Sequence, residues 1–365
     1  MASSNKAQLN QLQVLRAYAA MIVALAHIFH ELDPVFGTHM FENVWYDLRS
    51  GVDLFFVLSG FIIVFVTGRH FGNASYRPNF FYRRITRIVP IYWVYTSLML
   101  AIVLAAPSLA ASVKTSPEHT IASYLFIPWP NPDGALGPLL GVGWTLLYEM
   151  MFYVTFTFVI GLKMWRAIGA LAVVFIGLVV ARALFHTQMP FYLDYWSNPM
   201  ILEFLAGAVI AGLYLQFRTR FHWALGLGLT LFAFAWYAIG WHMPAFAGQE
   251  RVVLLGIPSA LIIFALTFGT KGLPAGLKWP HWLVVVGNSS YSLYLSHFFT
   301  IGASVAILEK LGLIQRLPAV SWILPILAVC VIVGLVSYLL IEKPVMEFAR
   351  RQEPKLRKRP VAGGV

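Results

Sequence analysis

The sequence predicts an all-α polytopic membrane protein with about ten transmembrane helices and both termini in the cytoplasm. Of its 365 residues, 59% are hydrophobic and only 11% are charged, whereas about a quarter of the residues of a soluble domain are charged. The apolar residues gather in long segments that approach the ~20 residues needed to span a bilayer. Helices are expected because backbone groups in hydrocarbon must be hydrogen-bonded internally.

Ten apolar segments can be drawn along the chain. The second is short and contains Ser59 and Gly60, so we expect it to be broken or strongly tilted. The loop at 107–139 is rich in Pro, Gly and Asn; it either folds over an opening or only connects two spans. The ten segments are 11–30, 52–68, 86–106, 140–161, 166–186, 199–217, 222–241, 251–269, 282–304 and 320–341.

The basic residues predict the orientation of these segments. When alternate loops are assigned to opposite sides, the side of the N-terminus carries 19 Lys and Arg and the other side carries six. The positive-inside rule then places both termini in the cytoplasm. The net charge of +11 therefore reflects loops beside a membrane and predicts no nucleic-acid partner. We expect one transmembrane domain at 1–345 and a basic cytoplasmic tail at 346–365 that contacts anionic membrane lipid.

The first segment carries two polar side chains that are costly in hydrocarbon, Arg16 and His27. Eleven residues at about 100° each make three turns plus roughly 20°, so both side chains share one face, ~16 Å apart along the axis. We expect this face to line a polar passage that joins the two sides of the membrane. A packing role for the histidine is the alternative. The single Cys330 argues against a cysteine-based metal site, and we expect no metal.

Further polar residues follow in the next two segments. Asp53, at the outer end of the second, orients an imidazole, accepts a proton or caps a helix, and Gly51 and Gly60 allow close helix packing. Arg84 and Arg87 share a face at the start of the third, with Arg83 beside them. These arginines either anchor the span in the cytoplasm or bind the phosphates of a cytosolic ligand.

The fourth and ninth segments carry the remaining candidates. Glu149 lies about two turns inside its span, with Trp144 and Tyr148 close by in sequence. A buried carboxylate needs a partner, and Arg16 and His27 are the candidates. His297 lies within a serine-rich span and is the polar residue of that span that we retain as a candidate.

These motifs, in this order, resemble the membrane acyltransferase-3 family. The resemblance rests on Arg16 and His27 in the first span and on four motifs, GVDLFFVLSGF, RRITR, GWTLLYEMMFY and GNSSYSLYLSHFF. It covers residues 10 to about 345. Members are bacterial O-acyltransferases that modify lipopolysaccharide, exopolysaccharide and related glycans. The short form is similar to exopolysaccharide-production acetyltransferases of the ExoZ type. Larger relatives carry an extracytoplasmic hydrolase-like domain, so a separate protein or direct transfer is expected here.

The resemblance implies a role for each candidate. His27 matches the family's catalytic histidine and Arg16 its companion. Arg84 and Arg87 match an element that engages the acyl donor, and Glu149 matches the acidic residue of a motif in which Thr145 replaces a serine. His27 would act as a general base or be transiently acylated, with Asp53 or Glu149 fixing its tautomer. The remaining substrate-binding candidates are Arg83, Trp144, Tyr148 and His297.

The implied reaction takes an acyl group from cytosolic acetyl-CoA, or a similar acyl-CoA, to a hydroxyl of a polysaccharide or lipid-linked oligosaccharide. The chain would work in the bacterial inner membrane without a permanently bound cofactor, within or beside a glycan biosynthesis complex. A proton-coupled transporter or flippase of a lipid-linked sugar is the competing class, because buried Arg, His and Glu also relay protons. Such proteins often have two similar halves, whereas here the charged motifs crowd the first four spans.

Overall fold

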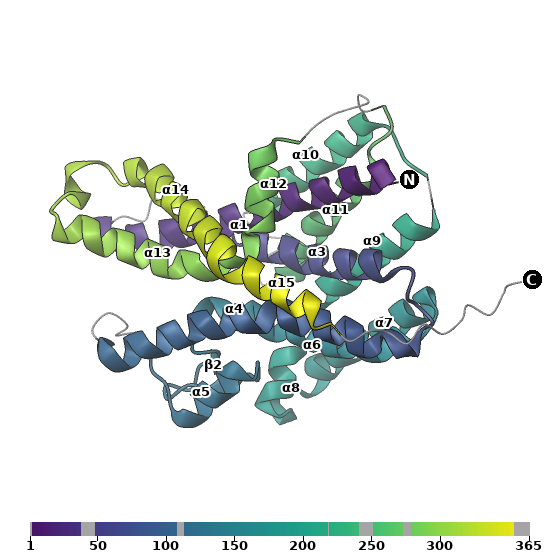
Figure 1. Cartoon of the computed structure of the whole chain (residues 1–365), viewed down its shortest axis with the longest axis horizontal. Helices are drawn as coiled ribbons and strands as arrows, with labels where there is room; N and C mark the ends of the chain where they lie inside the picture. Colours follow the sequence, from purple (N-terminus) through teal and green to yellow (C-terminus); the bar gives the residue numbers. More distant parts are fainter. Residues whose placement is uncertain are drawn as a thin grey trace, which may run out of the picture.

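In the computed structural model, long helices run side by side along the longest axis of the molecule (Figure 1). It describes residues 2–37, 48–107, 113–217, 219–240, 251–272 and 279–353. The helices of the first half are α1 (Ala2–Phe36), α3 (Ser50–Thr67), η1 (Ala74–Tyr76), α4 (Arg77–Ala105), α5 (Pro117–Tyr124), η3 (Gly141–Gly143), α6 (Trp144–Val159) and α7 (Met164–Phe185).

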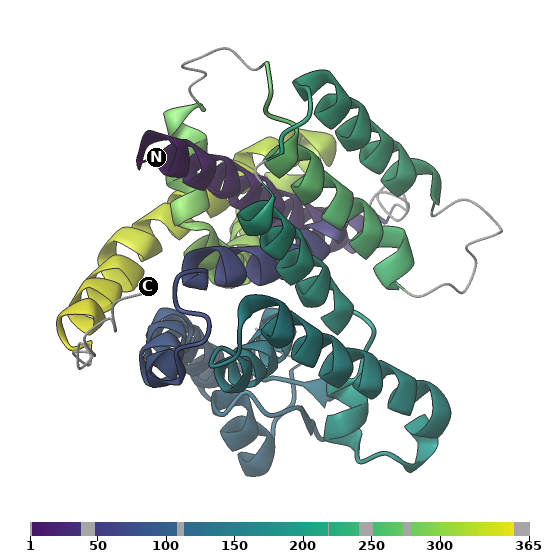
Figure 2. The ribbon, with the colours of Figure 1, turned by 90° about the vertical axis from the view of Figure 1, so that its right-hand side faces the viewer.

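The second half continues the bundle, and the end-on view separates the blue and teal helices α4 to α7 from the purple, green and yellow ones (Figure 2). Its helices are η4 (His186–Gln188), α8 (Phe191–Trp196), α9 (Ile201–Gln216), α10 (Trp223–Gly240), η6 (Val252–Gly256), α11 (Ile257–Phe268), α12 (His281–Asn288), α13 (Ser290–Lys310), η7 (Ile314–Arg316), α14 (Val320–Ser337), η8 (Tyr338–Glu342) and α15 (Lys343–Arg351).

The all-α polytopic class is confirmed by eight helices that are long and apolar enough to cross a membrane, counted among the described residues. They span Asn10–Phe36, Ser50–Thr67, Ala74–Ala105, Gly141–Val159, Met164–Gln188, Phe191–Gln216, Ser290–Lys310 and Val320–Arg351. Each coincides with one of the ten predicted segments. At the two other predicted positions stand shorter apolar helices, Trp223–Ile239 and Val252–Phe268. A helix of 17 residues is ~25 Å long, somewhat less than the ~30 Å hydrocarbon core.

Three details of the predicted segments are wrong. The second is not broken at Ser59 and Gly60, because α3 is one continuous helix. The ninth is two helices, because α12 ends at Asn288 and α13 begins at Ser290. The third begins earlier, at Arg77, with a proline in its first turn that lacks an N–H and suits a helix start. The basic tail beyond residue 353 lies outside the described residues.

The loop at 107–139 is more regular than its composition indicates. It contains α5 and a short antiparallel hairpin of β1 (Trp129–Pro130) and β2 (Leu136–Gly137), in which Trp129 pairs with Gly137. Side chains of α4 hold it in place, since Tyr92 donates to Ser123 O at 3.0 Å and Trp93 donates to Tyr124 O at 2.9 Å. The described part of this loop therefore folds back onto α4.

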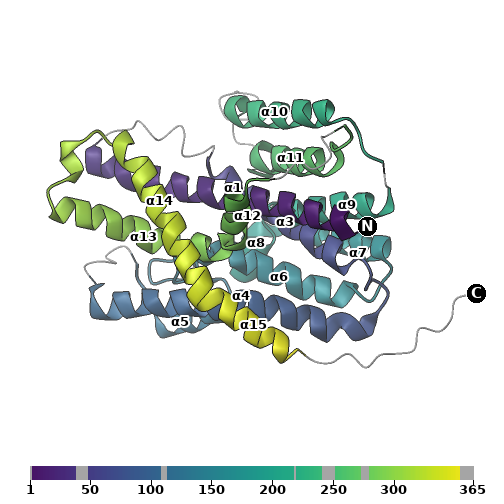
Figure 3. The ribbon, with the colours of Figure 1, turned by 45° about the horizontal axis from the view of Figure 1, so that its top comes forward.

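The helices α3 and α9 pack closely against each other. A Cβ added to Gly60 would lie 2.0 Å from Phe204 O, and one added to Gly207 would lie 2.0 Å from Val57 O. Only glycine allows the two backbones to approach this closely, as small residues do at membrane helix interfaces. The expectation that Gly60 permits close packing is confirmed. This contact holds α3, with its polar residues, in the middle of the bundle (Figure 3).

Candidate active site

A cavity of about 80 Å³ with charged and hydroxyl groups in its lining lies among α1, α3, α4, α6 and α13. Three arginines and one carboxylate line it, together with hydroxyl groups, in a part of the protein that is otherwise apolar. Its polar lining residues are Arg16, Ser59, Arg84, Arg87, Thr145, Glu149, Tyr153, Ser290, Tyr291 and Tyr294. The structure thus brings Arg16, Glu149 and two arginines of the RRITR motif, predicted separately, to one site.

Glu149 is held in this cavity by two hydroxyl groups. Ser59 Oγ donates to Glu149 Oε1 at 2.7 Å, and the hydroxyl of Tyr153, one turn further along α6, donates to the same oxygen. Glu149 shares the cavity with Arg16, whose Nη1 donates to Gln13 Oε1 at 3.1 Å. The carboxylate therefore faces three cationic side chains while both of its described hydrogen bonds come from neutral groups.

Arg84 and Arg87 also line a second, larger pocket of about 360 Å³. Because the two pockets have these arginines in common, they adjoin each other at this point of α4. The guanidinium of Arg84 lies over the rings of Phe80 and Tyr153, 5.6 and 5.8 Å from their centroids. The second pocket is lined by Tyr82, Arg83, Arg84, Thr86, Arg87, Met346, Ala349, Arg350 and Glu353.

The two candidate histidines meet in space although they are 270 positions apart. The ring of His27 lies 4.8 Å from that of His297 in an edge-to-face arrangement. His27 Nδ1 lies 2.9 Å from Val23 O. A carbonyl oxygen only accepts, so Nδ1 carries the proton in this contact and the lone pair of a neutral imidazole is at Nε2. His297 is fully buried, its Nδ1 lies 3.3 Å from Leu293 O, and its Nε2 has no hydrogen-bond partner among the described residues.

The histidine pair lies beside the cavity and is not part of its lining. Arg16 lines the cavity and His27 does not, so the expectation that both side chains line one passage is wrong for this cavity. Tyr294 connects the two places, since it lines the cavity and its ring centroid is 5.8 Å from that of His297. It is kept there by a hydrogen bond from its hydroxyl to Val142 O at 2.8 Å. His297 follows Tyr294 by three residues, so the pair lies about one helical turn beyond the cavity.

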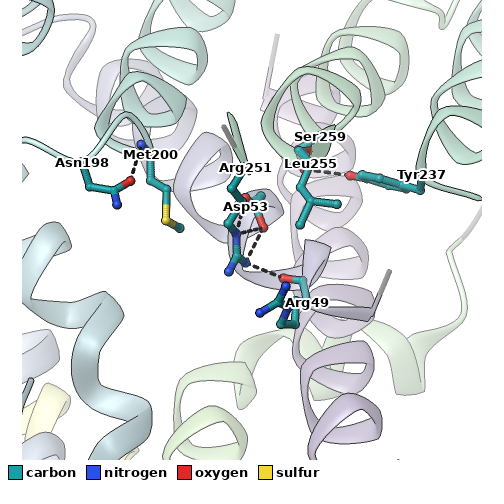
Figure 4. A network of polar contacts seen from close by, with 8 residues as sticks. All are labelled: Arg49, Asp53, Asn198, Met200, Tyr237, Arg251, Leu255 and Ser259. Carbon is teal, nitrogen blue, oxygen red and sulfur yellow. Dashed lines mark hydrogen bonds and ion pairs between the residues drawn. The ribbon is translucent and has the colours of Figure 1, made fainter. Parts of the chain in front are cut away.

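Asp53 has a different partner from the one predicted. Its carboxylate is fully buried and receives hydrogen bonds from Arg251, whose Nε lies 3.0 Å from Oδ1 and whose Nη2 lies 2.7 Å from Oδ2 (Figure 4). Arg251 Nη2 also donates to Arg49 O at 3.0 Å. The hypothesis that Asp53 or Glu149 fixes the tautomer of His27 is not supported, because the described bond of the His27 Nδ1 is to Val23 O.

Trp144 and Tyr148 do not line the cavity. Tyr148 is buried, stacks on the ring of Tyr195 at 4.9 Å and donates to Tyr195 O at 2.8 Å. Trp144 packs edge-on against Tyr148. The reason is helical geometry: on α6 these positions are about 140° and 100° away from Glu149, whereas Tyr153 at i+4 shares its face.

Sequence reasoning missed several residues of this region. Tyr153 and Tyr294 line the cavity, and the i+4 spacing from Glu149 would have indicated the first. Arg251 is a basic residue at the start of an apolar segment, and the sequence does not indicate its buried partner. Glu342 is buried and accepts a hydrogen bond from Ser292, which joins η8 to α13. Because charged residues follow it in the sequence, the sequence does not distinguish it from the basic tail.

Comparison with known proteins identifies the family. Residues 9–342 match the acyltransferase domain family. The chain belongs to this family of acyltransferases. It is therefore a multi-pass membrane protein and an enzyme that transfers acyl groups, as the motifs indicated.

Three curated relatives resemble this acyltransferase along most of its length. "Exopolysaccharide production protein ExoZ" of Rhizobium meliloti (strain 1021) is 32% identical, over 82% of this chain and 90% of the relative. "Nodulation protein 10" of Rhizobium leguminosarum bv. viciae is 26% identical, over 86% and 91%. "Putative peptidoglycan O-acetyltransferase YrhL" of Bacillus subtilis (strain 168) is 25% identical, over 81% of this chain and 50% of its own length. No solved structure matches this chain.

Proposed function

We propose that this acyltransferase moves an acetyl group from cytosolic acetyl-CoA to a hydroxyl of an extracytoplasmic or lipid-linked glycan in the bacterial inner membrane. The observation that carries the proposal is that two adjoining pockets share Arg84 and Arg87. One pocket is basic, and the other lies inside the bundle, near the edge-to-face pair of His27 and His297. The printed names of two relatives, which refer to exopolysaccharide production and peptidoglycan O-acetylation, support a glycan acceptor.

The basic pocket suits the phosphates of the donor. Guanidinium groups bind phosphate through paired hydrogen bonds, and Arg83, Arg84 and Arg87 are all at this pocket. The excess of basic residues on the side assigned to these arginines supports a cytosolic opening. The narrow pantetheine arm would then pass Arg84 and Arg87 into the inner cavity and bring the thioester toward Tyr294.

His27 suits the proton transfer that the reaction needs. The acceptor hydroxyl loses its proton to His27 Nε2 while its oxygen attacks the thioester carbonyl. The C–S bond breaks, and the departing thiolate receives the proton, so an ester and free CoA result. The bond from Nδ1 to Val23 O supports this role because it leaves the lone pair at Nε2. In the alternative route, Nε2 itself accepts the acetyl group before the hydroxyl does.

His297 would assist as a positioning residue. Its ring meets that of His27 edge-on at 4.8 Å and is completely buried, so it limits the orientations available to the His27 ring. Arg16 and Glu149 would act at the donor end, where the carboxylate offsets part of the positive charge of the three arginines.

The decisive experiment measures transfer of radiolabelled acetyl from acetyl-CoA to glycan in proteoliposomes that contain the purified protein. We expect His27→Ala to reduce transfer to background at an unchanged protein level, because no other imidazole contacts the reacting atoms in this scheme. His30→Ala, one turn further along α1 and exposed, is the matched control and should remain active. Activity retained in His27→Ala would contradict the assignment.

A second experiment tests the donor pocket. The double change Arg84→Ala with Arg87→Ala should raise the KM for acetyl-CoA by at least roughly tenfold, since each charge-assisted hydrogen bond contributes ~1.5–3 kcal/mol. The KM for the acceptor glycan should change much less. An unaltered dependence on acetyl-CoA would mean that the two arginines only anchor the span.

A further inference from the structure

The last helix, α15, packs against the first turns of α4. Tyr82 donates its hydroxyl hydrogen to Ala349 O at 3.0 Å, and Ala349 is buried in the contact. The basic pocket is lined by Arg350, which follows Ala349, and by Glu353, which lies two residues beyond the end of the helix. A segment that the sequence presents as a solvated basic end therefore supplies part of the wall of this pocket.

The pocket holds four arginines and one carboxylate. Glu353 Oε1 accepts hydrogen bonds from Arg83 Nε at 2.7 Å and from Asn79 Nδ2 at 3.2 Å. Its single negative charge is outnumbered by the four arginines that line the pocket. Arg84 adds a buried Nε that has no hydrogen-bond partner among the described residues. An anion with more than one negative charge and several acceptor oxygens would satisfy these groups better than the carboxylate does.

We propose that α15 completes the phosphate site of the acyl donor: Arg350 is a further phosphate-binding residue, and Glu353 is an internal anion that the donor's phosphate displaces from Arg83. This inference rests on the proposed function, in which the same pocket takes acyl-CoA. It makes Glu353 a built-in competitor that weakens donor binding and favours ligands with doubly charged phosphates over singly charged carboxylates.

The exposure of Arg83 and Glu353 allows a phosphate to displace Glu353 from Arg83. The side chain of Arg83 is 53% exposed and that of Glu353 is 20% exposed. Ion pairs of this kind are screened by solvent and contribute little to stability. Phosphate brings up to two charges and three acceptor oxygens, so it outcompetes one carboxylate oxygen for the same guanidinium. Glu353 follows the end of α15 at Arg351, so it can leave Arg83 without unwinding the helix.

The experiment uses the full-length protein in phosphatidylcholine nanodiscs and 3′,5′-ADP, the phosphate-bearing portion of CoA, as the calorimetric probe. Glu353→Gln should lower the dissociation constant about two- to fivefold, which is the range an exposed ion pair can contribute. Arg350→Gln should raise it about tenfold, as the loss of one charged phosphate contact does. With acetyl-CoA, both variants should change KM in the same directions and leave kcat unaltered.

The chain offers a matched control for each variant. Glu347→Gln removes the same charge from an exposed position of α15, and Arg351→Gln does so for the arginine. Neither residue lines the pocket, so neither control should change the dissociation constant.

The outcomes separate this inference from the proposed function. If the wild-type protein binds 3′,5′-ADP but Glu353→Gln and Arg350→Gln behave like their controls, the inference is overturned and the donor proposal stands. If the wild-type protein does not bind the probe, both are overturned. A phosphate of an anionic lipid has the same chemistry, so the titrations are repeated with phosphatidylglycerol. A pocket that responds to this lipid and not to the nucleotide would overturn the donor role of α15.

Discussion

Two arginine–carboxylate pairs in this acyltransferase differ in their surroundings. Asp53, in the first turn of α3, is fully buried and receives three hydrogen bonds of 2.7–3.2 Å from Arg251, whose side chain is 22% exposed. Glu353, after the last helix, receives one bond of 2.7 Å from Arg83, which is 53% exposed. Both pairs join an arginine to a carboxylate at a shortest distance of 2.7 Å, and they differ in burial and in the number of hydrogen bonds.

This difference assigns opposite roles to the two pairs. Removing one partner of a buried pair leaves a charge that has lost both water and its counter-ion, so the pair holds α3 and η6 together permanently. Glu353 of the exposed pair can return to water at little cost, so a ligand can replace it at Arg83. Glu149 lies between these extremes, because it faces cations in a cavity but is hydrogen-bonded only by hydroxyl groups.

The largest effect is expected from breaking the buried pair. Asp53→Asn should lower the free energy of unfolding by about 3–5 kcal/mol, because Arg251 loses the buried carboxylate that binds it. The measurement is the thermal unfolding midpoint in detergent. Asp133→Asn, in an exposed pair with Lys114 at 2.7 Å, is the matched control and should shift the midpoint little. Equal shifts in the two variants would show that burial does not distinguish the pairs.

The second effect is on activity at the intermediate carboxylate. Glu149→Gln should lower kcat/KM for acetyl transfer roughly 10²-fold, because the three arginines of the cavity lose the carboxylate that they face and a lost charged interaction costs up to ~3 kcal/mol. The unfolding midpoint should move less than in Asp53→Asn, because the amide oxygen still accepts from Ser59 and Tyr153. The exposed Glu309 of α13 provides the control substitution. If Glu149→Gln is fully active but has a strongly lowered unfolding midpoint, Glu149 is a structural residue, as Asp53 is.

A smaller effect is expected when the exposed pair is broken. Glu353→Gln should change the free energy of unfolding by at most ~1 kcal/mol, since exposed ion pairs rarely contribute more. The unfolding midpoint of this variant, compared with that of Asp53→Asn under the same conditions, checks the value. A shift as large as that of the buried pair would mean that α15 is held rigidly by this contact, and Glu353 could not be displaced.

The smallest effect concerns pH. Burial by itself would raise the pKa of Glu353, but hydrogen bonds from Arg83 and Asn79 outweigh it and hold the pKa below the usual 4.5. A carboxylate with a lowered pKa contributes its interaction fully above the unfolded-state value and loses it as the pH falls through the folded-state value. The ratio of the 3′,5′-ADP dissociation constants of wild type and Glu353→Gln should therefore stay constant from pH 8 to about 5 and approach one only below 4.5.

Titration of the probe itself affects both proteins equally, so it cancels in this ratio. A ratio that already changes between pH 6 and 7 would contradict the assignment, because a group other than Glu353 would then control access to Arg83.

Sequence alone determined the class of this protein and where most of its helices lie. Apolar segments of bilayer length are a local property, and eight of the ten predicted segments coincide with helices long enough to cross a membrane. The same reasoning identified Arg16, Arg84, Arg87 and Glu149 as polar residues that need partners in an apolar environment.

Tertiary structure alone decided which of these residues meet. The pairing of His27 with His297, of Asp53 with Arg251 and of Arg83 with Glu353 joins positions 198 to 270 residues apart. Helical periodicity shows which face a residue occupies but not which helix lies opposite. That choice depends on packing, such as the contact of Gly60 with the backbone of α9, and on the break at Ser289 that directs α12 away from α13.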